Sequence, residues 1–138
     1  VAVQVNQEMP RHVVTRVRDT LKSLHKDLAG SKILVIGVAY KRDTDDTRES
    51  PAVEILQLLA TEGAEVSYSD PFVPFLQANG ERLVSSPLSE QVIAAADCSV
   101  IVTDHSSVDY DMVGRHATVV VDRRNAMRNS TGKHIVRL

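Results

Sequence analysis

Charged side chains are concentrated in one short loop, where seven of the nine residues from 41 to 49 are ionisable. The loop follows an apolar run at residues 33–36 that ends at Gly37, which is typical of a strand buried on both faces. It leads to Ser50 and Pro51, an N-cap and a first helical residue. In α/β sheets such loops lie at the strand ends that bind ligands. The pattern therefore fits either a site for a charged, polyhydroxylated ligand or a solvated surface loop.

Further polar clusters follow other predicted strands, so that the full set is Lys41 with Arg48, Asp70, Asp104 with His105, and residues 123–125. Because the carboxyl ends of parallel strands meet at one edge of a sheet, we expect these clusters to share that edge. Lysine offers a point charge, and arginine offers a bidentate fork to phosphate or sugar hydroxyls. The sequence therefore predicts a site for an anionic ligand such as a nucleotide diphosphate.

The elements that position these residues alternate between helices and strands. A strand at 32–37, a helix from 51 that ends at Gly63 and a strand at 64–68 form a βαβ unit with parallel pairing. Beyond it we predict an irregular segment, an edge strand, a helix, a strand, a helix and two strands, at 72–80, 82–84, 89–96, 99–103, 109–115, 118–121 and 134–136. The predicted fold is a Rossmann-like three-layer αβα sandwich with a mainly parallel sheet, preceded by an N-terminal helix.

That first helix, predicted at residues 10–28, carries a narrow apolar stripe formed by Val14, Val17, Leu21, Leu24 and Leu28. Two heptads are too few to indicate a free coiled coil. The stripe must pack either on the sheet behind it or on the same helix of a second subunit, and the sequence leaves both open.

The overall composition bounds the function. The chain has 138 residues, 43% of them hydrophobic, and a formal net charge of -2, which argues against a general nucleic-acid binder. No apolar run reaches membrane-spanning length, and the start of the chain does not resemble a signal peptide. Since a lone cysteine allows no internal disulfide, we expect a cytoplasmic protein without membrane contact. The chain begins with Val1, which suggests a piece of a longer protein.

Two familiar sites fit poorly. A dinucleotide loop needs Gly-x-Gly-x-x-Gly after the first strand, whereas residues 37–41 hold one glycine. A flavodoxin-like receiver module needs a phosphorylatable aspartate after a middle strand and a lysine after the last, beside Mg²⁺. The pair Asp45 and Asp46 suggests such a module, but Arg124 stands where the lysine should be. The receiver remains the alternative hypothesis, as a binding module without catalytic activity.

Lesser candidates have simpler interpretations. Cys98 lies at a helix-to-strand junction on the wrong edge of the sheet, so we expect a packed small hydrophobe. His105 is expected to hold its loop. Asp45, Asp46 and Arg48 are expected to pair with one another and with backbone N–H groups, so that Lys41 points inward. The remaining histidines show no metal-ligand spacing, so no metal site is predicted.

Several ungapped motifs together resemble the C-terminal domain of the UDP-glucose/GDP-mannose dehydrogenase family. The segments that carry this resemblance, in chain order, are residues 6–10, 37–41, 44–51, 63–71, 103–106, 109–111 and 120–125. The later ones look most like the branch that oxidises UDP-N-acetylated hexosamines, UDP-GlcNAc or UDP-ManNAc, and UDP-glucose stays open as the substrate.

The resemblance implies an enzyme that oxidises the C6 hydroxyl of a nucleotide sugar to a carboxylate with two NAD. It implies that Tyr40, Lys41 and Arg124 contact the UDP-sugar and that Arg48 reaches the NAD. Arg123 replaces the usual threonine before Arg124, so either arginine could face the ligand, and we assign Arg124.

The same resemblance implies a division of labour between domains. Residues 1–30 would end a central helical region used for dimerisation, and residues 31–138 would form the nucleotide-sugar-binding domain. The catalytic cysteine and the NAD-binding domain would lie outside this chain. No catalytic residue is therefore assigned here, the isolated chain is expected to be inactive, and the complete enzyme is expected to be a homodimer or larger.

Overall fold

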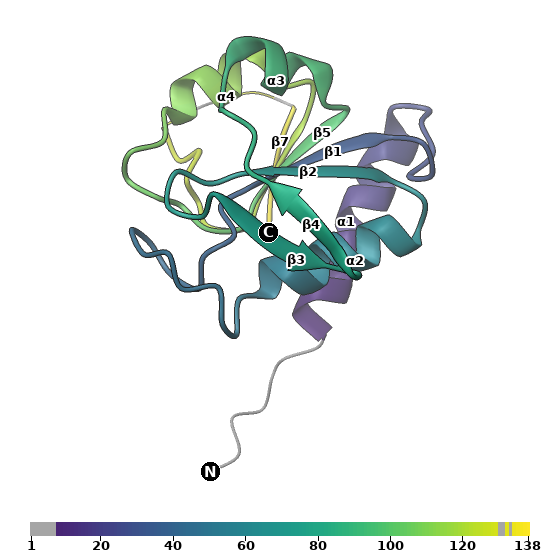
Figure 1. The fold of residues 1–138 in the computed structure, drawn as a ribbon. Coiled ribbons are helices and arrows are strands. Elements are labelled where there is room, and N and C mark those ends of the chain that lie inside the picture. Colours follow the sequence, from purple (N-terminus) through teal and green to yellow (C-terminus); the bar gives the residue numbers. More distant parts are fainter. Residues whose placement is uncertain (1–7, 130–131, 133) are drawn as a thin grey trace.

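A computed structural model describes residues 8–129, 132 and 134–138. Its centre is a five-stranded sheet in the order β2-β1-β5-β6-β7 (Figure 1). The strands are β1 at Lys32–Ile36, β2 at Glu65–Ser69, β5 at Cys98–Ile101, β6 at Val120–Asp122 and β7 at Ile135–Arg137. Every pairing within this sheet is parallel, as predicted. The order reverses between β1 and β5, which places the switch point of the sheet between the loops that follow these two strands.

Helices cover both faces of the sheet (Figure 1). One face carries α1 at Glu8–Ser23 and α2 at Pro51–Thr61, and the other carries α3 at Glu90–Ala95 and α4 at Tyr110–His116. Strand β1 shows why both faces are apolar. Ile33 and Val35 belong to the core cluster under α1 and α2, whereas Leu34 and Ile36 belong to the cluster under α3 and α4. The predicted Rossmann-like three-layer fold is confirmed.

Helix α1 packs on the rest of the domain. It contacts α2 and strand β5, and it buries Val13, Val14, Val17 and Leu21. Of the two partners left open for the stripe, the domain behind it is therefore the one observed. The prediction was wrong at its end, because the helix stops at Ser23 and Leu24 is exposed.

A β-hairpin replaces the irregular segment predicted at residues 72–80. Strand β3 at Phe75–Ala78 pairs antiparallel with β4 at Glu81–Val84, apart from the main sheet. The turn is Asn79-Gly80, and both residues have positive φ angles of 52° and 75°. Two such residues form the tightest hairpin turn, so the predicted edge strand at 82–84 pairs with β3 and not with the sheet.

Helix α2 begins as the sequence indicates. The Ser50 hydroxyl accepts a hydrogen bond from the Ala52 N–H at 3.2 Å, and Pro51 is the first helical residue. Within the described residues, no helix is long and apolar enough to cross a membrane.

Candidate functional site

The loop after β1 is built around Gly37. Its φ angle is 84°, and a Cβ at this position would lie 2.1 Å from the Thr103 carbonyl oxygen. The loops after β1 and β5 therefore touch through backbone atoms, which only glycine permits. The contact is reinforced by the Thr103 hydroxyl, which donates to the Ala39 carbonyl at 2.6 Å.

Asp70, at the end of β2, ties three loops together. Its Oδ2 accepts the N–H groups of Val38 and Ala39 at 2.8 and 3.2 Å. It also lies 2.8 Å from Nε2 of His105, in the loop after β5. Because Asp70 is only 3% exposed, these bonds form away from water and fix the path of the chain leaving β1.

His105 is wholly buried and joins this cluster to the charged loop. Its Nδ1 accepts the Asp43 N–H at 2.8 Å, so Nδ1 carries no proton and Nε2 donates to Asp70. The Asp43 carboxylate in turn accepts the N–H of Ser106 at 2.9 Å and its hydroxyl. These hydrogen bonds from Ser106 lower the pKa of Asp43. The predicted loop-holding role of His105 is confirmed.

The loops after β1, β5 and β6 meet at Asp104. Arg42 donates to the Asp104 carboxylate through Nη2 at 2.5 Å and to its carbonyl through Nε at 3.0 Å. Arg124 Nε donates to the other carboxylate oxygen at 3.4 Å. The hydrogen bond and charge of Asp104 raise the pKa of Arg42. Two arginines from loops far apart in sequence therefore meet at one sheet edge, but the cation from the charged loop is Arg42 and not the predicted Lys41.

Asp122, at the end of β6, shapes the loop that carries Arg124. Its carboxylate accepts the N–H groups of Arg124, Ala126 and Met127 at 3.0, 3.1 and 2.8 Å. The neighbouring Arg123 side chain turns to the Val102 carbonyl at 3.2 Å, and burial lowers its pKa. The Arg124 side chain is 46% exposed.

The other residues assigned from the sequence lie on the surface of the charged loop. Tyr40 is 53% exposed, and Lys41 is exposed without a hydrogen-bond or ion-pair partner among the described residues. Arg48 donates to the Asp46 carboxylate through Nε and Nη2, both at 3.0 Å, yet its side chain is 88% exposed. The pairing of Arg48 with Asp46 was predicted, and it lowers the pKa of Asp46 to about 2. The prediction was wrong for Asp45, which is exposed and takes no part in the described pairs. It was also wrong for Lys41, which is exposed because its neighbour Arg42 is the cation turned to Asp104.

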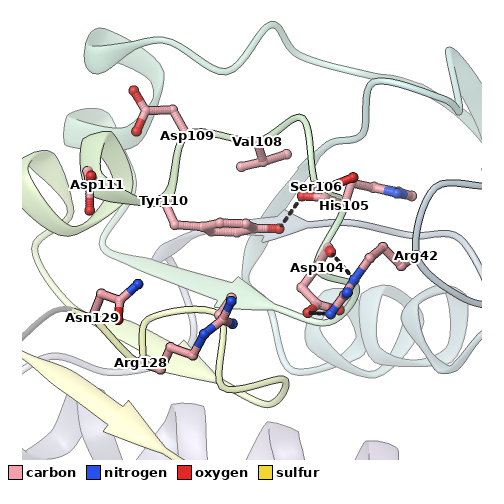
Figure 2. Close-up of a pocket in the computed structure, with 11 residues that line it drawn as sticks. Arg42, Asp104, His105, Ser106, Val108, Asp109, Tyr110, Asp111, Arg128 and Asn129 are labelled. Atoms are coloured by element: carbon pink, nitrogen blue, oxygen red, sulfur yellow. Dashed lines mark hydrogen bonds and ion pairs between the residues drawn. The ribbon is translucent and has the colours of Figure 1, made fainter.

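A pocket opens beside the Arg42–Asp104 pair (Figure 2). Tyr110 lies across it and donates from its hydroxyl to the His105 carbonyl at 3.0 Å; burial raises the pKa of this phenol. Arg128 and Asn129 form another part of the wall. Sequence reasoning missed these residues and Arg42, although Tyr110 follows the helix cap at Asp109 and lies in a segment of the family resemblance.

The described residues do not support a dinucleotide loop, a nucleophilic cysteine or a metal site. The Val38 and Ala39 N–H groups, which would face a pyrophosphate in a dinucleotide loop, are occupied by Asp70. This strand end therefore does not fit the phosphates of NAD. Cys98 is wholly buried, and burial raises the pKa of its thiol to about 12, which suits a packing role. The described part of the chain holds no group of metal-ligating side chains.

Comparison with known proteins decides the family. A profile described as the UDP-glucose/GDP-mannose dehydrogenase family, UDP binding domain, matches residues 34–129. The chain belongs to this family. The match spans all three loops that meet at Asp104. Because the chain belongs to this family, the alternative hypothesis of a flavodoxin-like receiver module is rejected.

Named relatives agree with the family assignment. UDP-N-acetyl-D-mannosamine dehydrogenase of Pyrococcus horikoshii is 31% identical over 93% of this chain. UDP-glucose 6-dehydrogenase of Rickettsia conorii is 30% identical over 96% of the chain. The solved structure of UDP-D-ManNAc dehydrogenase from Pyrococcus horikoshii superposes with a TM-score of 0.78 at 28% identity over 96% of the chain.

The present chain spans only about a third of the length of those relatives. It spans 30% of the Pyrococcus horikoshii sequence and 32% of the Rickettsia conorii sequence. In the solved Pyrococcus horikoshii structure it corresponds to 31% of the chain.

Proposed function

We propose that this chain is the nucleotide-sugar-binding part of an NAD-dependent dehydrogenase that oxidises the C6 hydroxyl of a UDP-sugar to a carboxylate. The observation that carries the proposal is the meeting of Arg42 and Arg124 on Asp104, at the sheet edge where such folds bind ligands. Guanidinium groups held together there suit a sugar diphosphate.

Each assigned residue has a distinct role in this proposal. Tyr40 and Lys41 contact the nucleotide sugar, and the exposed ammonium of Lys41 is available to its oxygens. Arg124 is proposed to lie at the sugar end, and its greater exposure than that of Arg123 supports the choice of Arg124 as the ligand contact. Arg48 reaches from the same charged loop toward NAD, and its high exposure suits contact with another domain.

In this proposal the domain binds and orients the nucleotide sugar, while residues outside the domain carry out the hydride transfer. NAD accepts the hydride when bound, and the engagement of the Val38 and Ala39 N–H groups by Asp70 supports the proposal that its phosphates bind another domain. Holding the diphosphate fixes the C6 hydroxyl against that domain and lowers the entropic cost of reaction. By itself, this chain is inactive.

The boundaries follow from the same proposal. Residues 1–30 end the central helical region through which the complete enzyme forms a homodimer or larger assembly, and residues 31–138 form the binding domain. Residues 1–7 lie outside the described part of the chain. Helix α1 packs firmly on α2, which suits a rigid connection between the two regions.

The substrate is proposed to be a UDP-N-acetylated hexosamine, UDP-GlcNAc or UDP-ManNAc, in preference to UDP-glucose. The named relatives include enzymes of both kinds, and the mannosamine enzyme of Pyrococcus horikoshii also has a similar structure. The test is NADH formation by the complete enzyme with each sugar in turn. Turnover of an acetylated sugar well above UDP-glucose supports the proposal, and the reverse ranking overturns the choice of sugar.

A further inference from the structure

The carboxylate of Asp104 stands between two guanidinium groups. Its side chain is 6% exposed, whereas those of Arg42 and Arg124 are 55% and 46% exposed. The partners come from loops far apart in sequence, after β1 and after β6, and Asp104 itself follows β5. One buried acid therefore joins three loops at the site (Figure 2 shows the Arg42 half).

Charge explains why such an acid is needed. Two guanidinium groups that approach one another repel, and the attraction of both to a carboxylate between them offsets that repulsion. With two positive charges and one negative, the cluster retains a net positive charge. Among the described contacts, the Arg124 side chain donates only through Nε, which leaves its terminal nitrogens available to a ligand.

We propose that Asp104 is a positioning residue, and that its carboxylate holds Arg42 and Arg124 together so that both guanidinium groups grip the diphosphate of a nucleotide sugar. This inference rests on the function proposed above. It adds Arg42 as a ligand contact and assigns to Asp104 a role exerted through the two arginines. Asp104 itself does not touch the diphosphate.

The direction in which one substitution changes the affinity for UDP separates this role from a general electrostatic effect. Asp104→Asn makes the site more positive, so a purely long-range effect would tighten the binding of UDP. If Asp104 positions the arginines, the same change weakens binding, by about tenfold for the loss of a charge-assisted hydrogen bond. Arg42→Gln, at an exposed side chain, should weaken UDP binding by about threefold to tenfold.

Asp111→Asn is the matched control. Asp111 lines the same pocket, is exposed, and has no hydrogen bond to either arginine (Figure 2). Removing its charge leaves the Arg42–Asp104–Arg124 cluster intact, so UDP binding should be unchanged or tighter. The two aspartate variants thus change the formal charge equally, but only Asp104→Asn should weaken UDP binding.

The experiment is an amide NMR titration of the 138-residue chain with UDP, for the parent, the three single variants and the Asp104→Asn/Arg42→Gln double variant. The proposal expects weaker UDP binding by Asp104→Asn and by Arg42→Gln. In the double variant, the loss of binding free energy should be smaller than the sum of the two single losses. The Arg124 Nε–Hε signal should shift in Asp104→Asn but not in Asp111→Asn. Dispersed spectra verify the fold of each variant.

The outcomes are separable. If the parent binds UDP and Asp104→Asn binds it equally or more tightly, the positioning role is overturned and the proposed function stands. Equal loss in Asp111→Asn also overturns it, because the effect would then not run through the arginines. If Asp104→Asn loses its dispersed spectrum, normal UDP binding by Arg42→Gln overturns the proposal. Absence of any UDP binding by the parent counts against the proposed function and the inference together.

Discussion

His105 and Asp70 share a hydrogen bond of 2.8 Å between side chains that are both entirely removed from solvent. Through its other nitrogen His105 holds the backbone of Asp43, so one imidazole connects the end of β2 with the middle of the charged loop. The charged loop is therefore anchored by buried hydrogen bonds, and its exposed side chains remain available to a ligand.

Removing that imidazole should destabilise the fold. His105→Ala leaves the buried Asp70 carboxylate with one donor fewer and the Asp43 N–H without its acceptor, and it opens a cavity. We expect a loss of about 3 kcal/mol in the free energy of unfolding, measured by urea denaturation. His12→Ala, at an exposed position of α1, should change it by less than about 0.5 kcal/mol. Equal effects would contradict the anchoring role.

Two glycines with nearly equal φ angles test the contact between loops. Gly37 and Gly30 have φ angles of 84° and 85°, but a Cβ at Gly30 meets nothing within 4 Å. Gly30→Ala should therefore cost about 1 kcal/mol from backbone strain alone. Gly37→Ala adds a collision with the Thr103 carbonyl and should cost more than about 3 kcal/mol. Thermal or urea unfolding measures both, and similar losses would refute the close approach.

The pairing within the charged loop should appear in a carboxyl titration. Arg48 holds the pKa of Asp46 at about 2, below the ordinary value of 3.8, mainly through its side-chain hydrogen bonds. A carboxyl whose pKa is lowered in the folded state contributes stability above its ordinary pKa. That contribution is lost as the pH falls from about 4 to about 2.

Arg48→Ala should raise the Asp46 pKa only part of the way, because the backbone N–H of residue 48 still donates to the carboxylate. Lys41→Ala should raise it less, since the Lys41 charge is the smallest of the causes. Carboxyl carbon NMR of the folded chain measures these values. An Asp46 pKa that stays at about 2 in Arg48→Ala would show that the pairing is absent in solution.

In the complete enzyme, two cationic residues of one loop should affect different ligands. Lys41→Ala should raise the KM for the UDP-sugar by about tenfold with little change for NAD. Arg48→Ala should raise the KM for NAD more than that for the sugar. Steady-state kinetics with each substrate varied in turn measures both, and the opposite ordering would remove the NAD role of Arg48.

The sequence predicted most of the fold because its strongest signals are local. The apolar run of β1 and the cap at Ser50 fix the first βαβ unit. The hairpin was missed although Asn79-Gly80 is a strong turn signal, because β3 has only four residues and its exposed Phe75 breaks the alternation of apolar and polar side chains. Helix α1 ends early at Ser23, where the apolar spacing gives no indication of a stop.

The candidate site was predicted at the level of loops but not of contacts. Topology alone brings the loops after β1, β5 and β6 to one edge. Which of the adjacent cations Lys41 and Arg42 meets Asp104 depends on the path of the backbone, which includes a positive φ angle at Asp43. No periodic pattern encodes that choice, so Arg42 appears only in three dimensions.

The central claim is that the loops after β1 and β6 bind a nucleotide diphosphate. Amide NMR of the chain titrated with UDP, GDP and UDP-N-acetylglucosamine tests it most directly. The account predicts shifts concentrated at residues 37–50 and 122–126, weak binding overall, and a stronger response to the uridine ligands than to GDP. Shifts confined to residues outside the loops after β1, β5 and β6, or none at high UDP concentration, would contradict it.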